Sequence, residues 1–269
     1  SAGGNNLIAA DTFTAGESFG TSKDSVVTGA GNDTINLAGG ADTVRSGAGN
    51  DIVSVGNTTN GDLTADTDAN LIDLGADNDL VNIKLDNLTS ADTIDGGTGF
   101  DLVNLTGGGF LRESETRNVS NVEGINLLDG SLSYDVTLST DLVATSDDVR
   151  GNQRVFSILT SGSTKSGDDT AGDVKVDLTN IDLKSGNLNN SIRYSGQATN
   201  ASERLVVNDR IMDQFLHAEF GEIFPNLNDK DPKNDTVQDD SGLEDVIEVQ
   251  DSAEITTVDL QNISGLEVF

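Results

Sequence analysis

Aspartates recur at a fixed interval in the first part of the chain, with residues around them that suit a metal ion. Asp24, Asp33, Asp42 and Asp51 are each nine residues apart, and an aliphatic residue follows each by two positions. Glycines precede the last three, as in Gly-Ala-Gly-Asn-Asp at 29–33. Closely spaced glycines permit backbone angles that turn carbonyl oxygens toward one point. Because calcium binds six to eight oxygens, carboxylate and carbonyl alike, the pattern predicts calcium sites in these turns.

Other segments carry the same turn in complete or altered form. Residues 96–103 fit the glycine, aspartate and aliphatic positions throughout, whereas the turn at 75–79 has Asp77 where a glycine is expected. The turn before Asp24 keeps a single glycine. An acidic loop at 228–240 resembles half of an EF-hand loop and is interpreted as an irregular calcium site. The alternative is that these aspartates are solvated turn and loop residues, since Asn-Asp and Gly-Asp are ordinary turn sequences.

The candidate ligands of several calcium ions are the aspartates and glycines at the metal-facing positions of these turns. In chain order they are Asp24, Gly31, Asp33, Gly40, Asp42, Gly49, Asp51, Asp77, Asp79, Asp92, Gly97, Gly99, Asp101, Asp229, Asp231 and Asp235. Calcium is the one cofactor that this pattern predicts.

The spacing also predicts how the chain folds around these turns. In a β-strand, residues two apart face the same side, so Asp33 and Ile35 face inward together, as do their equivalents in each repeat. Only 4% of the residues are aromatic and there is no Trp. A core of Val, Ile, Leu and Ala suits flat, stacked β layers, so we expect an all-β fold with short strands between the turns.

The nine-residue repeat resembles the calcium-binding nonapeptide of RTX proteins, most specifically at 29–54 and 96–103. The resemblance implies a parallel β-roll, or β-solenoid, in which successive nonapeptides alternate sides. Turns 18 residues apart would then stack and share an ion, Asp33 with Asp51 and Asp24 with Asp42.

The composition excludes several classes of partner. The chain has 46 acidic and 15 basic residues, a formal net charge of −31. Nucleic acids and anionic lipids need a positive surface, so we expect neither as a partner. No run approaches the roughly 18 apolar residues of a membrane span, and no secretory signal opens the chain; we expect no direct membrane insertion. Without cysteine, disulfides are excluded, and calcium can take their place as a cross-link.

The sequence divides into two predicted regions, an RTX-like β-roll at 1–105 and a β-rich module at 106–269. Alternating apolar and polar residues at 132–138 and 174–178 indicate strands of a further β-solenoid or a β-sandwich. Apolar residues at helical spacing predict one short helix at 209–224.

A second repeat links the two regions. The segment 101–123 begins with Asp-Leu-Val-Asn-Leu and ends with Asn-Val-Ser-Asn-Val-Glu, and a similar segment follows 144 residues later at 245–267. This pairing of a glycine-rich calcium turn with a following strand resembles modules of bacterial surface-layer proteins and large RTX adhesins.

Catalytic groups are scarce in this sequence. There is one His and no Cys, and adjacent acids such as Asp147 and Asp148 point to opposite faces of a strand. The resemblance therefore implies a non-catalytic structural protein, extracellular or at the cell surface of a bacterium, that folds and assembles when calcium binds. Its expected partners are further copies of itself, in a lattice or filament, or a host or cell-surface glycan.

Two other functions remain open at this point. The chain could be the calcium-binding region of a secreted RTX hydrolase or toxin whose catalytic part lies elsewhere, although such rolls usually lie near the C-terminus and this one comes first. Alternatively, it could be a sugar-binding adhesin module in which the acids of the calcium loops are ligands.

Overall fold

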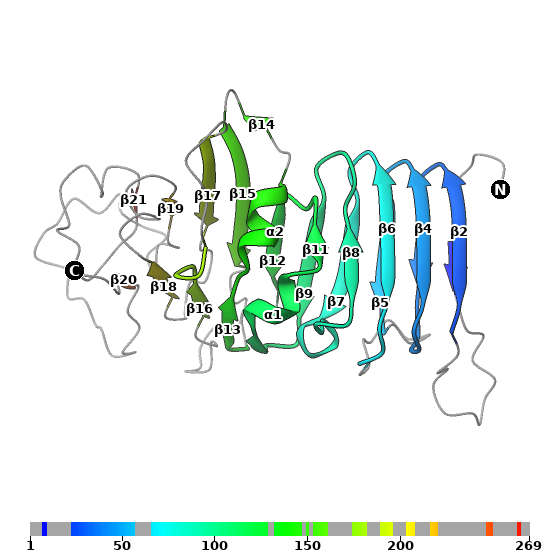
Figure 1. The fold of residues 1–269 in the computed structure, drawn as a ribbon, viewed down its shortest axis with the longest axis horizontal. Helices are drawn as coiled ribbons and strands as arrows, with labels where there is room; N and C mark the ends of the chain where they lie inside the picture. Colours follow the sequence, from blue (N-terminus) through cyan, green and yellow to red (C-terminus); the bar gives the residue numbers. More distant parts are fainter. Residues whose placement is uncertain are drawn as a thin grey trace, which may run out of the picture.

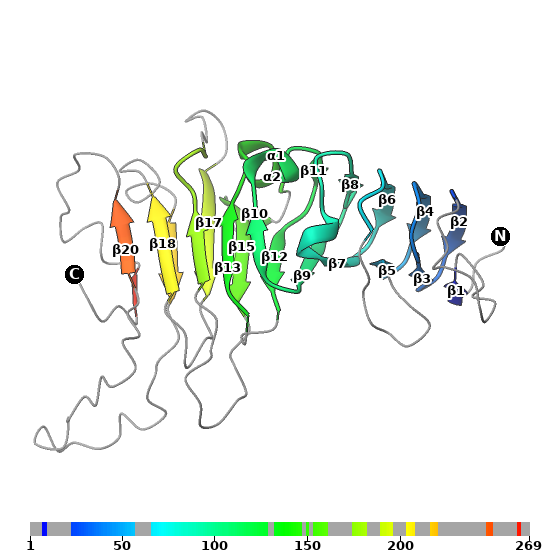
Figure 2. The same ribbon diagram turned by 90° about the horizontal axis from the view of Figure 1, so that it is seen from below.

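The computed structural model describes residues 7–9, 23–56, 66–128, 132–146, 149–150, 153–160, 174–181, 189–195, 203–207, 216–219, 246–249 and 263–264. In these residues the chain winds into an elongated stack of β coils. Figure 1 shows the strands side by side across the long axis, and Figure 2, seen from below, shows that they form two layers. All strand pairs are parallel except that between β14 and β15.

One layer is an 11-stranded sheet that runs the length of the described coils. Its strands in spatial order are β1 (Leu7–Ala9), β3 (Thr34–Asn36), β5 (Ile52–Val55), β7 (Leu80–Lys84), β9 (Leu102–Thr106), β12 (Gly124–Leu127), β15 (Gln153–Thr160), β17 (Asn189–Ser195), β19 (Leu216–Glu219) and β21 (Ile263–Ser264), with β14 (Val149–Arg150) beside β15.

The other layer consists of two 5-stranded sheets. The first contains β2 (Ser25–Ala30), β4 (Thr43–Ala48), β6 (Leu71–Ala76), β8 (Thr93–Asp95) and β11 (Val119–Ser120). The second contains β10 (Gly109–Leu111), β13 (Tyr134–Thr137), β16 (Val174–Asp177), β18 (Glu203–Val207) and β20 (Val246–Val249).

The core lies between the layers and follows from the alternation of the strands. In β4, Val44 and Ser46 are buried while Thr43 and Arg45 face outward. The same alternation buries a row of aliphatic side chains in each layer, and every fully buried Val, Ile or Leu contributes roughly 1.5–3 kcal/mol. The prediction of an all-β fold with a parallel β-roll is confirmed, including the stacking of strands 18 residues apart, Ile35 beside Val53.

The coils continue past the predicted boundary at residues 105 and 106. Strand β9 pairs in parallel with β12, and β12 pairs with β15 in the same sheet. The described strands of the second region therefore extend the solenoid. The repeat at an offset of 144 residues also has a structural counterpart, because β9 and β11 recur as β20 and β21, although each recurs in the opposite layer.

The prediction of a helix at 209–224 is wrong for those residues of this range that the structure describes. Leu216–Glu219 forms strand β19, which pairs with β17 and β21. The apolar spacing fits a helix, but the free edge of β17 offers backbone hydrogen bonds to an extended chain, and tertiary pairing overrides a weak local preference. The other residues of 209–224 lie outside the described part of the chain.

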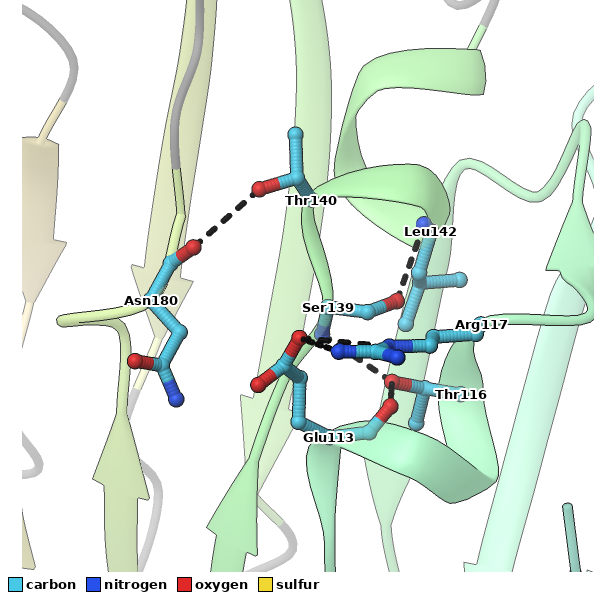
Figure 3. A network of polar contacts seen from close by, with 7 residues as sticks. All are labelled: Glu113, Thr116, Arg117, Ser139, Thr140, Leu142 and Asn180. Carbon is cyan, nitrogen blue, oxygen red and sulfur yellow. Dashed lines mark hydrogen bonds and ion pairs between the residues drawn. The ribbon is translucent and has the colours of Figure 1, made fainter.

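The helices of the described chain lie elsewhere and are short: η1 (Leu85–Asn87), α1 (Glu113–Thr116) and α2 (Thr140–Thr145). One hydrogen bond joins α1 to the N-cap of α2, and Figure 3 shows it together with the polar contacts at each helix. Thr116 Oγ1 accepts a hydrogen bond from the Ser139 amide at 3.0 Å, Ser139 Oγ caps α2 by accepting from Leu142 N, and Arg117 pairs with Glu113 at 2.7 Å. Both helices lie where the sheet containing β2 ends at β11.

Candidate metal centre

Four glycine-rich turns stack along one edge of the roll, which we call the first edge. They are residues 29–33, 47–51, 75–79 and 97–101, and they join β2 to β3, β4 to β5, β6 to β7 and β8 to β9. Gly29 lies beside Gly47, and Gly47 beside Gly75. Strands β2, β4, β6 and β8, which lead into these turns, stand side by side in Figure 1.

A row of buried carboxylates runs along the first edge, and we call it the acid row: Asp33, Asp51, Asp79, Asp101 and Glu123. Each is at most 3% exposed. The amide of each aspartate donates to a carboxylate oxygen of the next coil, at 2.7 Å from Asp33 to Asp51, from Asp51 to Asp79 and from Asp79 to Asp101, and at 2.6 Å from Asp101 to Glu123. The carboxylates therefore lie between successive turns.

The glycines of the first edge place carbonyl oxygens close to this row. A Cβ atom on Gly47 would lie 2.0 Å from the Gly29 carbonyl oxygen, and one on Gly99 would lie 1.9 Å from that of Asp77. The φ angles of Gly47 and Gly99 are +113° and +146°, which side chains disfavour. Only glycine lets one turn approach the carbonyls of the preceding turn so closely. The first edge thus presents carboxylate and carbonyl oxygens together.

The buried carboxylate of Asp79 is the clearest sign that the acid row can bind a cation. Its Oδ1 accepts the Asp51 amide, whereas its Oδ2 is buried without a hydrogen-bond partner. Burial, together with the negative charges of Asp51 and Asp77, raises the pKa of Asp79 to about 7 despite that hydrogen bond. A buried carboxylate without an opposite charge is costly, and a bound calcium ion would offset that cost.

Side chains alone do not complete a metal site. In the described residues, no three His, Cys, Asp or Glu side chains converge closely enough to hold a metal ion. Because calcium takes six to eight oxygens, including backbone carbonyls, the turn carbonyls of the first edge would have to supply the remaining ligands. Asp33, Asp51, Asp79 and Asp101 would supply the anionic ones.

The raised pKa of Asp79 predicts a pH dependence in metal-free protein. The unfolded carboxyl keeps a pKa near 3.8, so between about pH 4 and about pH 7 the folded chain binds more protons than the unfolded chain. The free energy of unfolding in EDTA should therefore fall by about 2–4 kcal/mol as the pH rises through this window. Urea unfolding of the wild type and Asp79→Asn across this range checks it, because the variant should lack this fall. Parallel profiles would contradict the prediction.

The opposite edge, the second edge, carries an equivalent ladder with a different chemistry. Asp24 N donates to Asp42 Oδ1, Asp42 N to Asn70 Oδ1, and Asn70 N to Asp92 Oδ1, at 2.8, 3.0 and 2.9 Å. Asp92 Oδ2 accepts from the amide and hydroxyl of Thr89, at 2.8 and 2.9 Å. Both Asp92 oxygens are thus used within the protein, and its role as a calcium ligand stays a prediction.

At the second edge, the side-chain amide of Asn70 takes the role that a cation would otherwise have. Its Nδ2 donates to Asp66 Oδ2 at 3.2 Å and to the Asp68 carbonyl oxygen at 3.3 Å. Burial raises the pKa of Asp66, and the hydrogen bonds from Asp68 N and Asn70 act in the opposite direction. The side-chain amide of Asn70 therefore stabilises the buried Asp66 carboxylate without a metal ion.

The substitution Asn70→Asp tests this role. It places a second carboxylate against Asp66, so in EDTA we expect a loss of about 2–4 kcal/mol in the free energy of unfolding. Millimolar calcium should restore much of this loss by bridging the two carboxylates. Asn118→Asp makes the same charge change at an exposed side chain, and its effect should stay below about 0.5–1 kcal/mol. Equal effects of the two substitutions would count against the assignment.

The sequence-derived ligands divide between the two edges. The first edge holds, besides the aspartates of the acid row, the predicted ligands Gly31, Gly49, Asp77, Gly97 and Gly99. The second edge holds Gly40, whose φ angle is +114°, together with Asp24, Asp42 and Asp92. Asp229, Asp231, Asp235 and the rest of the acidic loop 228–240 lie outside the described residues. Asp66, Asn70 and Glu123 belong to these networks but were not among the predicted ligands.

The comparison with protein families agrees with this geometry. Residues 20–53 and 88–108 match the family described as the RTX calcium-binding nonapeptide repeat, in 4 copies. The members of this repeat family bind calcium, so the match supports calcium binding in these two segments. They contain three of the four turns of the first edge, and the turn at 75–79 lies outside the match. The comparisons with curated proteins and with solved structures gave no match.

The repeat match supports calcium as the ion for these turns. Within the described part of the chain, no helix is long and apolar enough to cross a membrane.

Proposed function

We propose that this chain is a non-catalytic, extracellular or cell-surface structural module of a bacterium, of surface-layer or adhesin type, that folds and assembles when calcium binds. The observation that carries the proposal is the acid row: buried carboxylates in register between glycine turns, in segments that match the RTX repeat. Calcium at these positions would join successive coils, as a cross-link in a chain that has no cysteine.

The arrangement supports a structural role because the carboxylates are buried between stacked coils. Asp51, Asp79 and Asp101 each accept an amide hydrogen bond from the preceding coil, and each carboxylate of the acid row is at most 3% exposed. A solenoid also transmits order along its axis, since each coil contacts only its neighbours. Calcium binding at one pair of turns therefore favours the ordered state of the next pair.

The proposed extracellular location is compatible with the affinity that calcium sites of extracellular modules have. Extracellular calcium modules commonly have dissociation constants of about 10⁻⁴ to 10⁻³ M. Sites of that strength would be empty in cytosol and filled outside the cell, so that folding would follow export.

Electron microscopy of the purified chain, with millimolar calcium and with EDTA, tests the assembly part of the proposal. We expect ordered sheets or fibres in calcium and none in EDTA. Dispersed single particles in both conditions would contradict self-assembly, and a glycan array probed in calcium would then distinguish a sugar-binding module from an isolated scaffold unit.

A further inference from the structure

Asp77 departs from the pattern of the first edge in a way that affects its backbone. It occupies the position at which the other turns of the edge carry Gly31, Gly49 and Gly99. Its φ angle is +80°, and Asn121 is the other non-glycine residue of the described chain with a positive φ. For a residue with a side chain this conformation costs about 1–2 kcal/mol, and such strain often accompanies function.

The side chain of Asp77 reaches back to the preceding turn. Its Oδ2 accepts a hydrogen bond from the Gly49 amide at 3.1 Å. In the same pair of turns, Asp79 Oδ1 accepts the Asp51 amide at 2.7 Å. Asp77 therefore adds a second carboxylate to the contact between the turns 47–51 and 75–79, at a position where the other turns of the first edge have glycine and no side chain.

The second observation is that both aspartates between these two turns, Asp51 and Asp79, have a buried Oδ2 without a hydrogen-bond partner. Asp79 is 97% buried, from an exposure of 3%, and its Oδ2 has no hydrogen-bond partner. The negative charges of Asp51 and Asp77 both act on it. A cation between the two turns would be adjacent to this oxygen and would offset all three charges.

We propose that Asp77 makes the space between turns 47–51 and 75–79 the tightest calcium site of the first edge. This rests on the proposed function, because it ranks the calcium sites of that edge. The added carboxylate contributes through its charge, and it need not contact the ion. One more negative charge at about 6 Å from a divalent ion, in a medium between bulk water and a protein surface, raises affinity about ten- to a hundredfold.

Calcium determines whether the strained Asp77 stabilises or destabilises the turn. Without calcium, Asp77 destabilises the roll through its backbone and through repulsion of Asp51 and Asp79. With calcium, the same charge strengthens binding. Substitution by glycine should therefore have opposite effects on metal-free stability and on calcium affinity.

Calcium titration calorimetry and urea unfolding in EDTA, applied to the full chain, test this directly. We expect Asp77→Gly to be more stable than wild type in EDTA, and its tightest calcium site to be at least tenfold weaker. Asp77→Asn, which keeps a side chain at the positive φ, should weaken the same site without the full gain in stability. Asp86→Asn removes a charge from the exposed η1 turn and should leave calcium affinity unchanged.

Two results would overturn the inference. A calcium titration of Asp77→Gly that superimposes on the wild type would show that Asp77 is only a strained turn residue, while the proposed function would stand. Failure of the wild type itself to bind calcium would overturn both. Equal weakening by Asp77→Asn and Asp86→Asn would show a general effect of net charge and would also reject the role of Asp77.

Discussion

Removal of calcium with EDTA is expected to disorder the coils of the first edge and to lower the melting temperature of the chain strongly. The acid row buries carboxylates in facing turns, and in EDTA their repulsion has no counter-charge. At ten times its dissociation constant, each calcium ion adds about 1.4 kcal/mol. Sites between the four turns would together add about 4 kcal/mol, which is most of the stability of a marginal domain of about 5 kcal/mol.

Far-ultraviolet circular dichroism and thermal unfolding, in millimolar calcium and in EDTA, measure this effect. Magnesium provides the control for ionic strength, because its small size and strict octahedral geometry suit these turns poorly. We expect magnesium to restore little of the β signal. Identical spectra and melting curves in calcium and in EDTA would show that the turns fold without the ion.

The second large effect is expected from Gly47→Ala. A Cβ at this position would lie 2.0 Å from the Gly29 carbonyl oxygen, and the φ of Gly47 is +113°. The two backbones would have to separate, which would disrupt the stacking of the turns on both sides. We expect a loss of at least about 3 kcal/mol in the free energy of unfolding, together with weaker calcium binding.

Gly109→Ala is the matched control for this substitution. Its φ is +117°, close to that of Gly47, but its Cβ would meet no atom closer than 3.4 Å. The control therefore carries the same backbone strain without the collision, and a loss of about 1–2 kcal/mol is expected. Similar losses for Gly47→Ala and Gly109→Ala in urea unfolding would mean that close approach of the turns adds nothing beyond strain.

The regular part of the fold could be predicted because its spacing is fixed. The interval of 18 residues between Asp33 and Asp51 sets one coil, and both the strand register and the hydrogen bond between them follow it. The next coils of the acid row span 28 and 22 residues, from Asp51 to Asp79 and then to Asp101. A search at constant period loses the register there, although the coil itself continues.

The rest of the candidate site could not be predicted from residue type. Asn70 and Glu123 occupy ladder positions that are aspartate in the regular repeats, and only the three-dimensional stacking shows their equivalence. The ladder hydrogen bond needs an acceptor oxygen, and an Asn or Glu side chain supplies one as well as Asp. The predicted helix failed for a related reason, because Leu216–Glu219 is extended by pairing with strands distant in sequence.

The central claim, that calcium binds between the stacked turns of the first edge, is tested most directly by anomalous diffraction from crystals of the chain grown in calcium. The account predicts anomalous peaks between successive turns, about 2.3–2.6 Å from carboxylate oxygens of Asp33, Asp51, Asp79 or Asp101. A map from well-diffracting crystals that shows no anomalous peak along the first edge would contradict it.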